Sequence, residues 1–391
     1  FEYRDGRLWV EEGPLEGPEL PCEDMSALPE AVVQQRFEAF GARPYDPSTG
    51  RVARFLLVRL AGGRAVLLCG FHHLVMDGWS WTVFLEDLTS ILRGDPLPPV
   101  RLSYASYCED QAAAVQAGLG DADLAYWRGI ASGMSPRSAL PGNAPGAPQD
   151  EARGATVRST LGAAQSEAVA RCAQRLGTTP FRLCFAAFAA WLARLTGDDG
   201  QRIATILTGR SQPAETALFG FCNTYGIVDA ETGGGTPFRQ LVASVSDEIS
   251  NAIRHQHLPA GYTLKAAGFR EVAHDVARCR PSFVKIPRQR RLAAGNLTLS
   301  DRRIVLPSIA HELSVDWQQE RDGIALTWTY PSGRLLRTSV EDFAQQYGHV
   351  LTQFVDNPDL TVEEVVLLSP AQQAAILNQG CGPERSFPVD V

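Results

Sequence analysis

Two adjacent histidines and an aspartate four residues further on are the residues of this sequence best suited to chemistry. His72 and His73 follow an apolar segment that predicts a strand, so we expect their side chains to point to opposite faces and to have different roles. A histidine titrates near neutral pH and suits deprotonation of an amine or alcohol. Gly78 is expected to permit a tight turn in which Asp77 orders the loop or holds an arginine.

Two other interpretations of this pattern compete with catalysis. A buried structural histidine pair beside a turn aspartate also fits, because the short spacing recurs by chance. The doubled histidine, the Gly-Trp-Ser that follows Asp77 and the preceding hairpin favour a functional site. Metal binding is not favoured, since no third histidine stands at helical or turn spacing.

Composition places the chain among soluble globular proteins. It has 391 residues, 45% of them hydrophobic and 20% charged. The net charge of -8 gives no overall attraction to nucleic acid or to an anionic membrane. The 8 cysteines are scattered singly, which gives no support for a zinc or redox motif. With no signal peptide and no apolar run of about 20 residues, we expect a cytoplasmic location.

The elements that must position the histidines can be read from periodicity. Two strands at 54–60 and 64–71 form a hairpin that leads into His72, and Ser80 is expected to cap a helix ending near Gly94. The helix expected at 179–195 is apolar nearly all round and should be buried. Further helices are expected at 104–117, 121–130, 164–176 and from 339, and further strands at 155–161, 201–207, 312–317 and 323–330. The mixture predicts an α/β protein built of α+β layers.

Residues 71–80 resemble the signature of condensation domains of non-ribosomal peptide synthetases, in the chloramphenicol-acetyltransferase-like superfamily. Residues 102–107 with Gln111 are similar to the family's tyrosine-rich segment, although Ser106 replaces the usual Asp and Asp110 the usual Trp. Other segments with family resemblance are 218–224, one residue shorter than usual, 255–259, and more weakly 280–284.

The resemblance implies a fold of two chloramphenicol-acetyltransferase-like lobes arranged as a V around a central tunnel. We place the N-terminal lobe at 1–162, the C-terminal lobe at 163–377 and a linker toward an adenylation domain at 378–391. Family members begin with a strand and a helix before a segment like residues 1–4, so the first lobe is expected to lack its beginning in this sequence.

The function implied is amide (peptide) bond formation in antibiotic or siderophore biosynthesis. The amine of an acceptor aminoacyl thioester would attack a donor acyl or peptidyl thioester. The domain would bind no cofactor of its own, because both substrates are carried on phosphopantetheine arms. Its partners would be an upstream donor peptidyl carrier protein, a downstream adenylation domain and an acceptor peptidyl carrier protein.

The resemblance also assigns roles to individual residues. His73 would face the tunnel and either take the amine proton or orient the nucleophile and the tetrahedral intermediate. The Gly78 N–H is a candidate oxyanion donor. His72 and Asp77 would be structural, with Arg210 as the expected partner of Asp77. The remaining candidates are Asn223 and Thr224, for the tunnel floor or a loop cap, and His255 and His257, for structure.

Several functions within the same fold stay open. An epimerisation domain has the same histidine motif, but its later motifs are not evident here and the C-terminal residues are typical of the linker to an adenylation domain. Heterocyclisation is disfavoured because it would replace the histidine motif. An ester-forming acyltransferase would use the same histidine chemistry. A catalytically silent recruitment module would usually have a degraded motif, whereas this one is intact.

Overall fold

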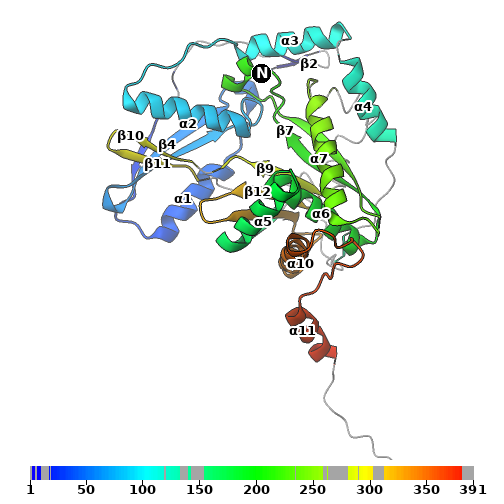
Figure 1. The fold of residues 1–391 in the computed structure, drawn as a ribbon. Helices are drawn as coiled ribbons and strands as arrows, with labels where there is room; N and C mark the ends of the chain where they lie inside the picture. Colours follow the sequence, from blue (N-terminus) through cyan, green and yellow to red (C-terminus); the bar gives the residue numbers. More distant parts are fainter. Residues whose placement is uncertain are drawn as a thin grey trace, which may run out of the picture. The chain divides into compact units, whose positions relative to one another are not determined.

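The computed structural model describes residues 2–4, 7–9, 17, 19–118, 120–132, 140–141, 154–233, 235–258, 262, 281–288, 290–302 and 312–380. The chain forms two compact units (Figure 1). Unit 1 consists of Phe1–Gly118, Thr208–Asn223 and Gln289–Leu306. Unit 2 consists of Leu119–Leu207, Thr224–Arg288 and Pro307–Val391.

Unit 1 contains the hairpin that leads to the histidines. Strands β4 (Ala53–Arg59) and β5 (Ala65–Phe71) are antiparallel, and β3 (Cys22–Asp24) runs parallel to β4 at the edge. The turn between β4 and β5 is the 3-10 segment η2 (Ala61–Gly63), where Gly62 and Gly63 have positive φ. The predicted hairpin is confirmed. Helix α1 (Glu30–Ala42) packs against the sheet, and its Val33 belongs to the small core that includes Leu56.

The described remainder of unit 1 consists of four helical segments and two small hairpins. Helix α2 (Gly78–Arg93) follows the histidines and ends at Gly94 in a left-handed conformation, as predicted. The other elements are η1 (Pro47–Thr49), α3 (Tyr104–Gln116), η3 (Pro213–Ala217), β1 (Glu2–Arg4), β2 (Arg7–Trp9), β10 (Arg291–Ala294) and β11 (Leu297–Ser300).

Long-range contacts tie the third segment of unit 1 to α2. The Trp81 indole N–H donates to Asp301 at 3.1 Å, and Arg290 pairs with Glu86 at 2.6 Å. Arg93 donates to the carbonyl of Ala293 at 2.7 Å. Residues about 200 positions apart in the sequence therefore belong to one compact unit, which periodicity alone does not predict.

Unit 2 contains a six-stranded sheet with the order β6-β13-β12-β9-β7-β8. Its strands are β6 (Gly154–Leu161), β7 (Gly200–Leu207), β8 (Thr224–Glu231), β9 (Ser282–Ile286), β12 (Ser314–Gln319) and β13 (Ile324–Pro331). Strands β7, β9 and β12 are parallel, whereas β6, β13 and β8 join by antiparallel pairing. Its helices are α4 (Asp121–Ser132), α5 (Ala163–Arg175), α6 (Pro180–Thr196), α7 (Phe238–Arg254), α10 (Arg337–Asp356) and α11 (Pro370–Gly380).

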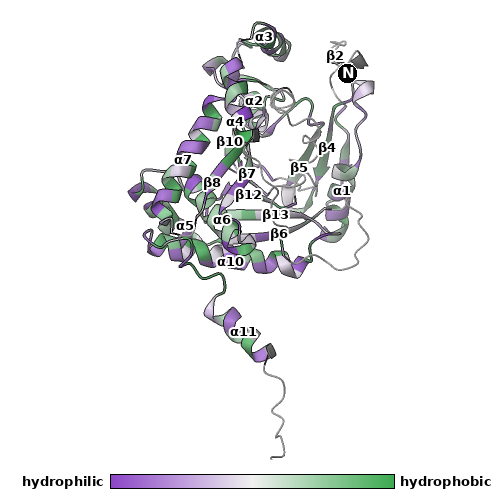
Figure 2. Ribbon diagram, turned by 90° about the vertical axis from the view of Figure 1, so that its right-hand side faces the viewer, coloured by the Kyte–Doolittle hydropathy of each residue, from purple (hydrophilic) through white to green (hydrophobic). Residues whose placement is uncertain are grey.

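Helix α6 is the centre of the core of unit 2. Thr179 caps it and Pro180 occupies its first turn, as the sequence predicts. Every residue from 183 to 193 is buried, because α6 contacts α5, α7, α10 and the sheet. In Figure 2, α7 and α10 carry both hydrophobic and hydrophilic residues, as expected for helices that cover this core.

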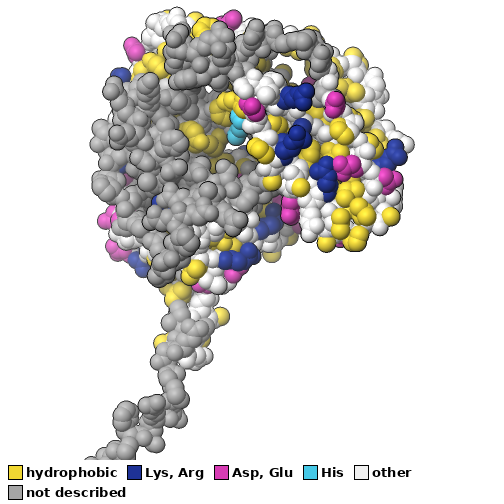
Figure 3. Space-filling model, turned by 180° about the vertical axis from the view of Figure 1, so that it is seen from behind, with side chains coloured by type: hydrophobic (Ala, Val, Ile, Leu, Met, Phe, Trp, Pro, Cys, Tyr) yellow, Lys and Arg dark blue, Asp and Glu magenta, His cyan; other side chains and the backbone are white. Residues whose placement is uncertain are grey.

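The described residues contain no single helix that is long and apolar enough to cross a membrane. Together α5 and α6 reach that length and hydropathy, but they are bent by 97° and α6 is a buried core helix. On the face shown in Figure 3, acidic and basic side chains are interspersed.

The units divide the chain differently from the single lobe boundary predicted at Gly162. Residues of β6 belong to unit 2, because this strand pairs with β13 along its whole length. Residues 208–223 and 289–306 belong to unit 1. At the C-terminus, α11 includes the first three residues of the linker predicted at 378–391, and the rest lies outside the described residues.

Candidate functional site

The first histidine directly follows the strand. Strand β5 ends at Phe71, and the His72 N–H still donates to the Val52 carbonyl at 2.7 Å. The His72 Nδ1 accepts the Leu74 N–H at 3.1 Å, and its ring lies edge-on to Tyr45 with centroids 6.0 Å apart. A half-buried ring with these contacts fits the predicted structural role.

The second histidine lies in the following turn and is exposed. Its Nδ1 is 2.7 Å from the carbonyl oxygen of Met76. Because a carbonyl only accepts, Nδ1 must carry the hydrogen, and the lone pair of the neutral His73 ring is then on Nε2. The ring also contacts Phe221, with centroids 5.0 Å apart and planes at 82°. The two histidines therefore contact different neighbours, and both lie beyond the end of the strand, so their predicted placement on opposite faces stays a prediction.

Two local predictions about the start of α2 are wrong. The N-cap is Asp77, not Ser80, and its carboxylate accepts the Ser80 N–H at 2.9 Å in a capping box. The earlier residue caps because Asp77 is extended, whereas the chain is already helical at Gly78. Gly78 is therefore the first helical residue and not a turn residue with unusual backbone angles; it is not among the described glycines with positive φ.

The pairing predicted between Asp77 and Arg210 is present. Arg210 Nη1 lies 2.7 Å from Asp77 Oδ2, and the two side chains are 2% and 0% exposed. Asp77 Oδ2 also accepts the Cys222 N–H at 2.9 Å. Burial would raise the pKa of Asp77, but the Arg210 bonds and charge and the N–H groups of Ser80 and Cys222 outweigh it and hold the pKa below its usual value. Asp77 is thus ionised, both of its carboxylate oxygens accept hydrogen bonds, and it is poorly suited to act as a base.

Arg210 also holds its own segment in place. Its guanidinium donates to the carbonyls of Glu215 at 3.2 Å, Thr208 at 3.1 Å and Leu218 at 3.0 Å. One buried arginine therefore closes the loop 208–218 and joins it to the start of α2. Burial raises the pKa of the neighbouring Cys222 thiol to about 12, so this cysteine stays protonated and is no nucleophile.

The lowered pKa of Asp77 makes the stability of the protein depend on acid pH. The ionised carboxylate contributes its full stabilisation above the unfolded value near 3.8, and the contribution is lost as the pH falls through the lower folded pKa. We expect Asp77→Asn to flatten the fall in unfolding free energy below about pH 4. Urea unfolding between pH 6 and 2.5 measures this slope.

The matched control is Asp87→Asn on the same helix. Burial raises the pKa of Asp87, and its charge therefore opposes folding at higher pH. We expect this substitution to change the slope in the opposite direction. Equal slopes in the wild type and Asp77→Asn would contradict the assigned ionisation of Asp77.

The segment that carries Phe221 is fastened to α2 and α3 by hydrogen bonds. The Gly220 N–H donates to Ser80 Oγ at 3.0 Å, and the Tyr104 hydroxyl donates to the Phe221 carbonyl at 2.9 Å. Tyr107, also on α3, donates to the Gly209 carbonyl at 3.1 Å. The tyrosine-rich segment noted in the sequence therefore supports residues 209–221 from one side.

Gly220 is needed because Tyr104 lies against it. A Cβ at this position would come within 2.2 Å of the Tyr104 ring, which the hydroxyl bond to Phe221 holds in place. We expect Gly220→Ala to lower the free energy of unfolding by about 1–3 kcal/mol. Urea unfolding measures this change, and Gly233→Ala is the control, because Gly233 is half-buried and a Cβ there meets nothing within 4 Å. Equal stability of the two variants would contradict this packing.

The other predicted site residues lie in different places. Asn223 is half-buried at the end of a unit 1 segment, whereas Thr224 is buried at the start of β8 and donates to the Leu258 carbonyl at 3.4 Å. Their predicted part in a tunnel floor stays a prediction. His255 and His257 both contact Asp123 of α4, at 2.9 Å and 3.3 Å. These contacts fit their predicted structural role; Pro259 and Arg280 lie outside the described residues.

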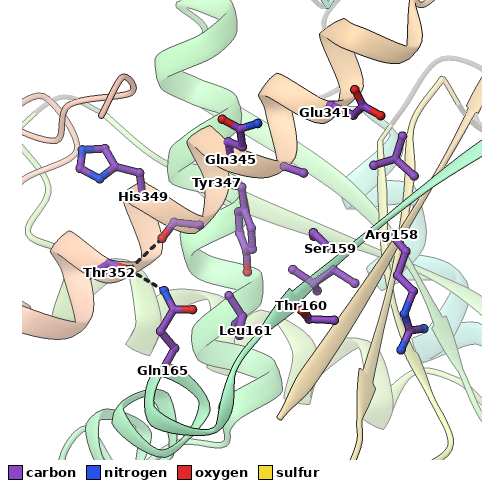
Figure 4. A pocket seen from close by; sticks show the side chains of 14 residues that line it. Arg158, Ser159, Thr160, Leu161, Gln165, Glu341, Gln345, Tyr347, His349 and Thr352 are labelled. Atoms are coloured by element: carbon purple, nitrogen blue, oxygen red, sulfur yellow. Dashed lines mark hydrogen bonds between the residues drawn. The ribbon is translucent and has the colours of Figure 1, made fainter. Parts of the chain in front are cut away.

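A pocket of about 510 Å³ lies elsewhere, within unit 2 (Figure 4). Strand β6 and helices α5 and α10 line it, and Thr352 accepts a hydrogen bond from Gln165 at 3.3 Å at one end. It contains none of the predicted site residues. Within the part of the chain that the structure describes, no group of three or more His, Cys, Asp or Glu side chains could hold a metal ion.

Sequence reasoning missed two features of the site. The contact of Phe221 with His73 joins residues 148 positions apart, and the Met76 carbonyl that fixes the His73 tautomer is a backbone group. The only sequence signal was that residues 218–224 belong to a motif, without an indication of what Phe221 touches.

The fold of this chain matches solved structures of condensation domains, which have the chloramphenicol-acetyltransferase-like fold. The first condensation domain of the calcium-dependent antibiotic synthetase, in complex with substrate analogue 3a, matches with a TM-score of 0.74 at 20% identity, over 92% of this chain and 82% of that chain. The four-domain non-ribosomal peptide synthetase holo-AB3403, bound to AMP and glycine, matches with a TM-score of 0.77 at 16% identity, over 94% of this chain and 29% of that chain.

The chain belongs to the condensation-domain family, whose model, Condensation domain, matches residues 18–377. Surfactin synthase subunit 1 of Bacillus subtilis is 26% identical over 89% of this chain and 10% of the relative. Phosphinothricin tripeptide synthetase PhsC of Streptomyces viridochromogenes is 32% identical over 62% of this chain and 23% of the relative. The chain thus spans about a tenth of the length of the multidomain synthetase surfactin synthase subunit 1.

Proposed function

We propose that this domain forms amide bonds between a donor acyl or peptidyl thioester and the amine of an acceptor aminoacyl thioester. The observation that carries the proposal is His73, exposed, with its Nδ1–H donated to the Met76 carbonyl and its Nε2 left to accept a proton. The family membership supports the same chemistry.

The proposed reaction begins when the acceptor amine attacks the carbonyl carbon of the donor thioester. As the C–N bond forms, one amine proton passes to His73 Nε2. The tetrahedral intermediate then breaks the C–S bond, and the leaving thiolate takes the proton back from His73. A thioester is already activated, so holding two tethered substrates in reach supplies much of the rate.

Gly78 is the proposed donor to the oxyanion of this intermediate. As the first residue of α2, its N–H has no acceptor within the helix, and it lies at the positive end of the helix dipole. Asp77 and Arg210 hold this helix end in place through their buried pair. The proposal therefore gives His73 and Gly78 contact with reacting atoms and gives Asp77 a structural role.

The substrates would arrive on the phosphopantetheine arms of a donor and an acceptor carrier protein. The homology to multidomain synthetases, such as surfactin synthase subunit 1, supports carrier proteins and an adenylation domain as partners. No cofactor of the domain's own takes part in the proposed reaction.

The test is a loaded-carrier assay. A panel of aminoacyl and fatty-acyl donor thioesters is mixed with aminoacyl acceptor carriers, and intact-protein mass spectrometry follows the acceptor. The expected product is an acyl-aminoacyl thioester on the acceptor carrier. Exchange of the donor α-hydrogen in heavy water without condensation would instead indicate epimerisation and overturn the proposal.

An ester-forming reaction is the second candidate, because His73 Nε2 can accept a proton from an alcohol as well as from an amine. The fold also matches the SgcC5 protein of Streptomyces globisporus in complex with a naphthyl ethanediol, with a TM-score of 0.72 at 21% identity, over 92% of this chain and 85% of that chain. Hydroxyacyl acceptors in the same assay separate the two. No turnover with either acceptor class, in a folded protein, would favour a recruitment module.

A further inference from the structure

We propose that Phe221 is a positioning residue for His73. The Asp77–Arg210 pair holds Phe221 in place through the hydrogen bond from the Cys222 N–H to Asp77. The proposal rests on the proposed function, because His73 is its proton acceptor there. It adds a residue that the histidine motif itself does not contain. It also explains how Asp77 acts on His73 without contacting it: the Asp77 carboxylate holds the backbone next to Phe221, and Phe221 contacts His73.

The first step is the contact itself. The Phe221 and His73 rings are nearly perpendicular, with centroids 5.0 Å apart, which is a favourable edge-to-face geometry. Phe221 is 36% exposed, so its side chain contributes little to the core of unit 1. Two residues earlier, Phe219 contacts Phe71 at 5.7 Å in the same way. The segment 219–221 therefore lies beside 71–73, with the contact between Phe219 and Phe71 first and the His73 contact second.

The second step is the backbone that places Phe221. Its carbonyl accepts the Tyr104 hydroxyl, and the residues on each side are fixed as well: Gly220 N–H donates to Ser80 Oγ, and Cys222 N–H donates to Asp77 Oδ2. All three partner groups are on or next to α2 and α3. With three consecutive residues anchored, little backbone freedom is left at Phe221, and its ring is directed at His73.

The third step is the effect on the histidine. The Nδ1–H bond to Met76 fixes one edge of the ring, but rotation about the side chain can still break this bond. Phe221 contacts the ring from a second direction and restricts this rotation, which keeps Nε2 as the atom that accepts the proton. The geometry thus assigns Phe221 to orientation of the base and not to contact with substrate.

The experiment compares Phe221→Ala, Phe221→Tyr and the matched control Phe219→Leu in the whole chain. Nitrogen-15 NMR of labelled histidine reports the His73 tautomer, with His73→Gln identifying its signals. The loaded-carrier assay reports kcat and KM. We expect Phe221→Ala to shift His73 toward a mixture of tautomers and to lower kcat about fivefold to tenfold at little-changed KM. Phe221→Tyr should restore both, and Phe219→Leu should leave the tautomer unchanged.

The readouts separate failure of this proposal from failure of the proposed function. If Phe221→Ala keeps the wild-type tautomer, the positioning role is overturned, whether or not kcat falls. If the tautomer shifts while the wild type forms no amide with any substrate pair, Phe221 still positions His73 and the proposed function is what fails. Asp77→Ala should shift the tautomer in the same direction; an unshifted tautomer in a folded Asp77→Ala protein would overturn the link through Cys222.

Discussion

Replacement of His73 by alanine is expected to lower the rate of amide formation by about 10²- to 10⁴-fold without unfolding the protein. The rate falls because no other group is assigned to the amine proton: Asp77 is buried and paired with Arg210, and the Cys222 thiol stays protonated. The fold survives because His73 is exposed and packs only at the surface. The measurement is the initial rate of product formation on the acceptor carrier, with a thermal melt of each variant.

Two further variants make this prediction sharper. His73→Gln keeps hydrogen-bonding groups but takes no proton at neutral pH, so it should be as slow as His73→Ala if His73 is a base, and much faster if it only orients the substrates. His349→Ala is the control, because this histidine lines the pocket of unit 2. Loss of activity in His349→Ala with an active His73→Ala would move the site to that pocket.

The second large effect is expected from breaking the buried ion pair. Asp77→Ala or Arg210→Ala should lower the free energy of unfolding by about 3–5 kcal/mol, since each leaves its partner charged and buried without a counter-charge. Urea unfolding measures the loss. Hydrogen exchange should become faster first at the start of α2 and in residues 208–223, because Arg210 joins these two segments.

The double variant provides the control for this pair. Asp77→Ala combined with Arg210→Ala should be no less stable than Arg210→Ala alone, because it leaves no unpaired charge in the interior. Arg210→Ala and the double variant both remove the Arg210 donor to the Thr208 and Leu218 carbonyls, so this loss of stability is the same in the two proteins. If the losses of unfolding free energy in the two single variants add up to that of the double variant within about 0.5 kcal/mol, the two residues act independently and the pairing is contradicted.

The local elements of this protein were predictable from its sequence. The hairpin before the histidines, the glycine that ends α2 and the buried helix α6 agree with the predictions, because short-range periodicity, caps and turns carry their signals in neighbouring residues. The start of α2 was misplaced because Asp77 and Ser80 are both good caps, and only the backbone angles distinguish them.

The pairing of Asp77 with Arg210 came from a motif resemblance and not from any local pattern, since 133 positions separate the two residues. The compact units were not predictable in the same way. Residues 208–223 and 289–306 belong to unit 1, where hydrogen bonds such as that from Trp81 to Asp301 hold them. Such bonds produce no periodic pattern in the sequence. Long-range partners of this kind are chosen by tertiary packing.

The sequence by itself determined the residue types for the chemistry: the two histidines, the aspartate and the glycine, within an α/β chain whose helices and strands it located. Only the tertiary structure decided which nitrogen of His73 carries the hydrogen and that Phe221 lies against its ring. The physical reason is that a tautomer depends on the acceptor the ring meets, here the Met76 carbonyl, and a ring orientation depends on its neighbours. Both are set by backbone geometry and distant segments rather than by local composition.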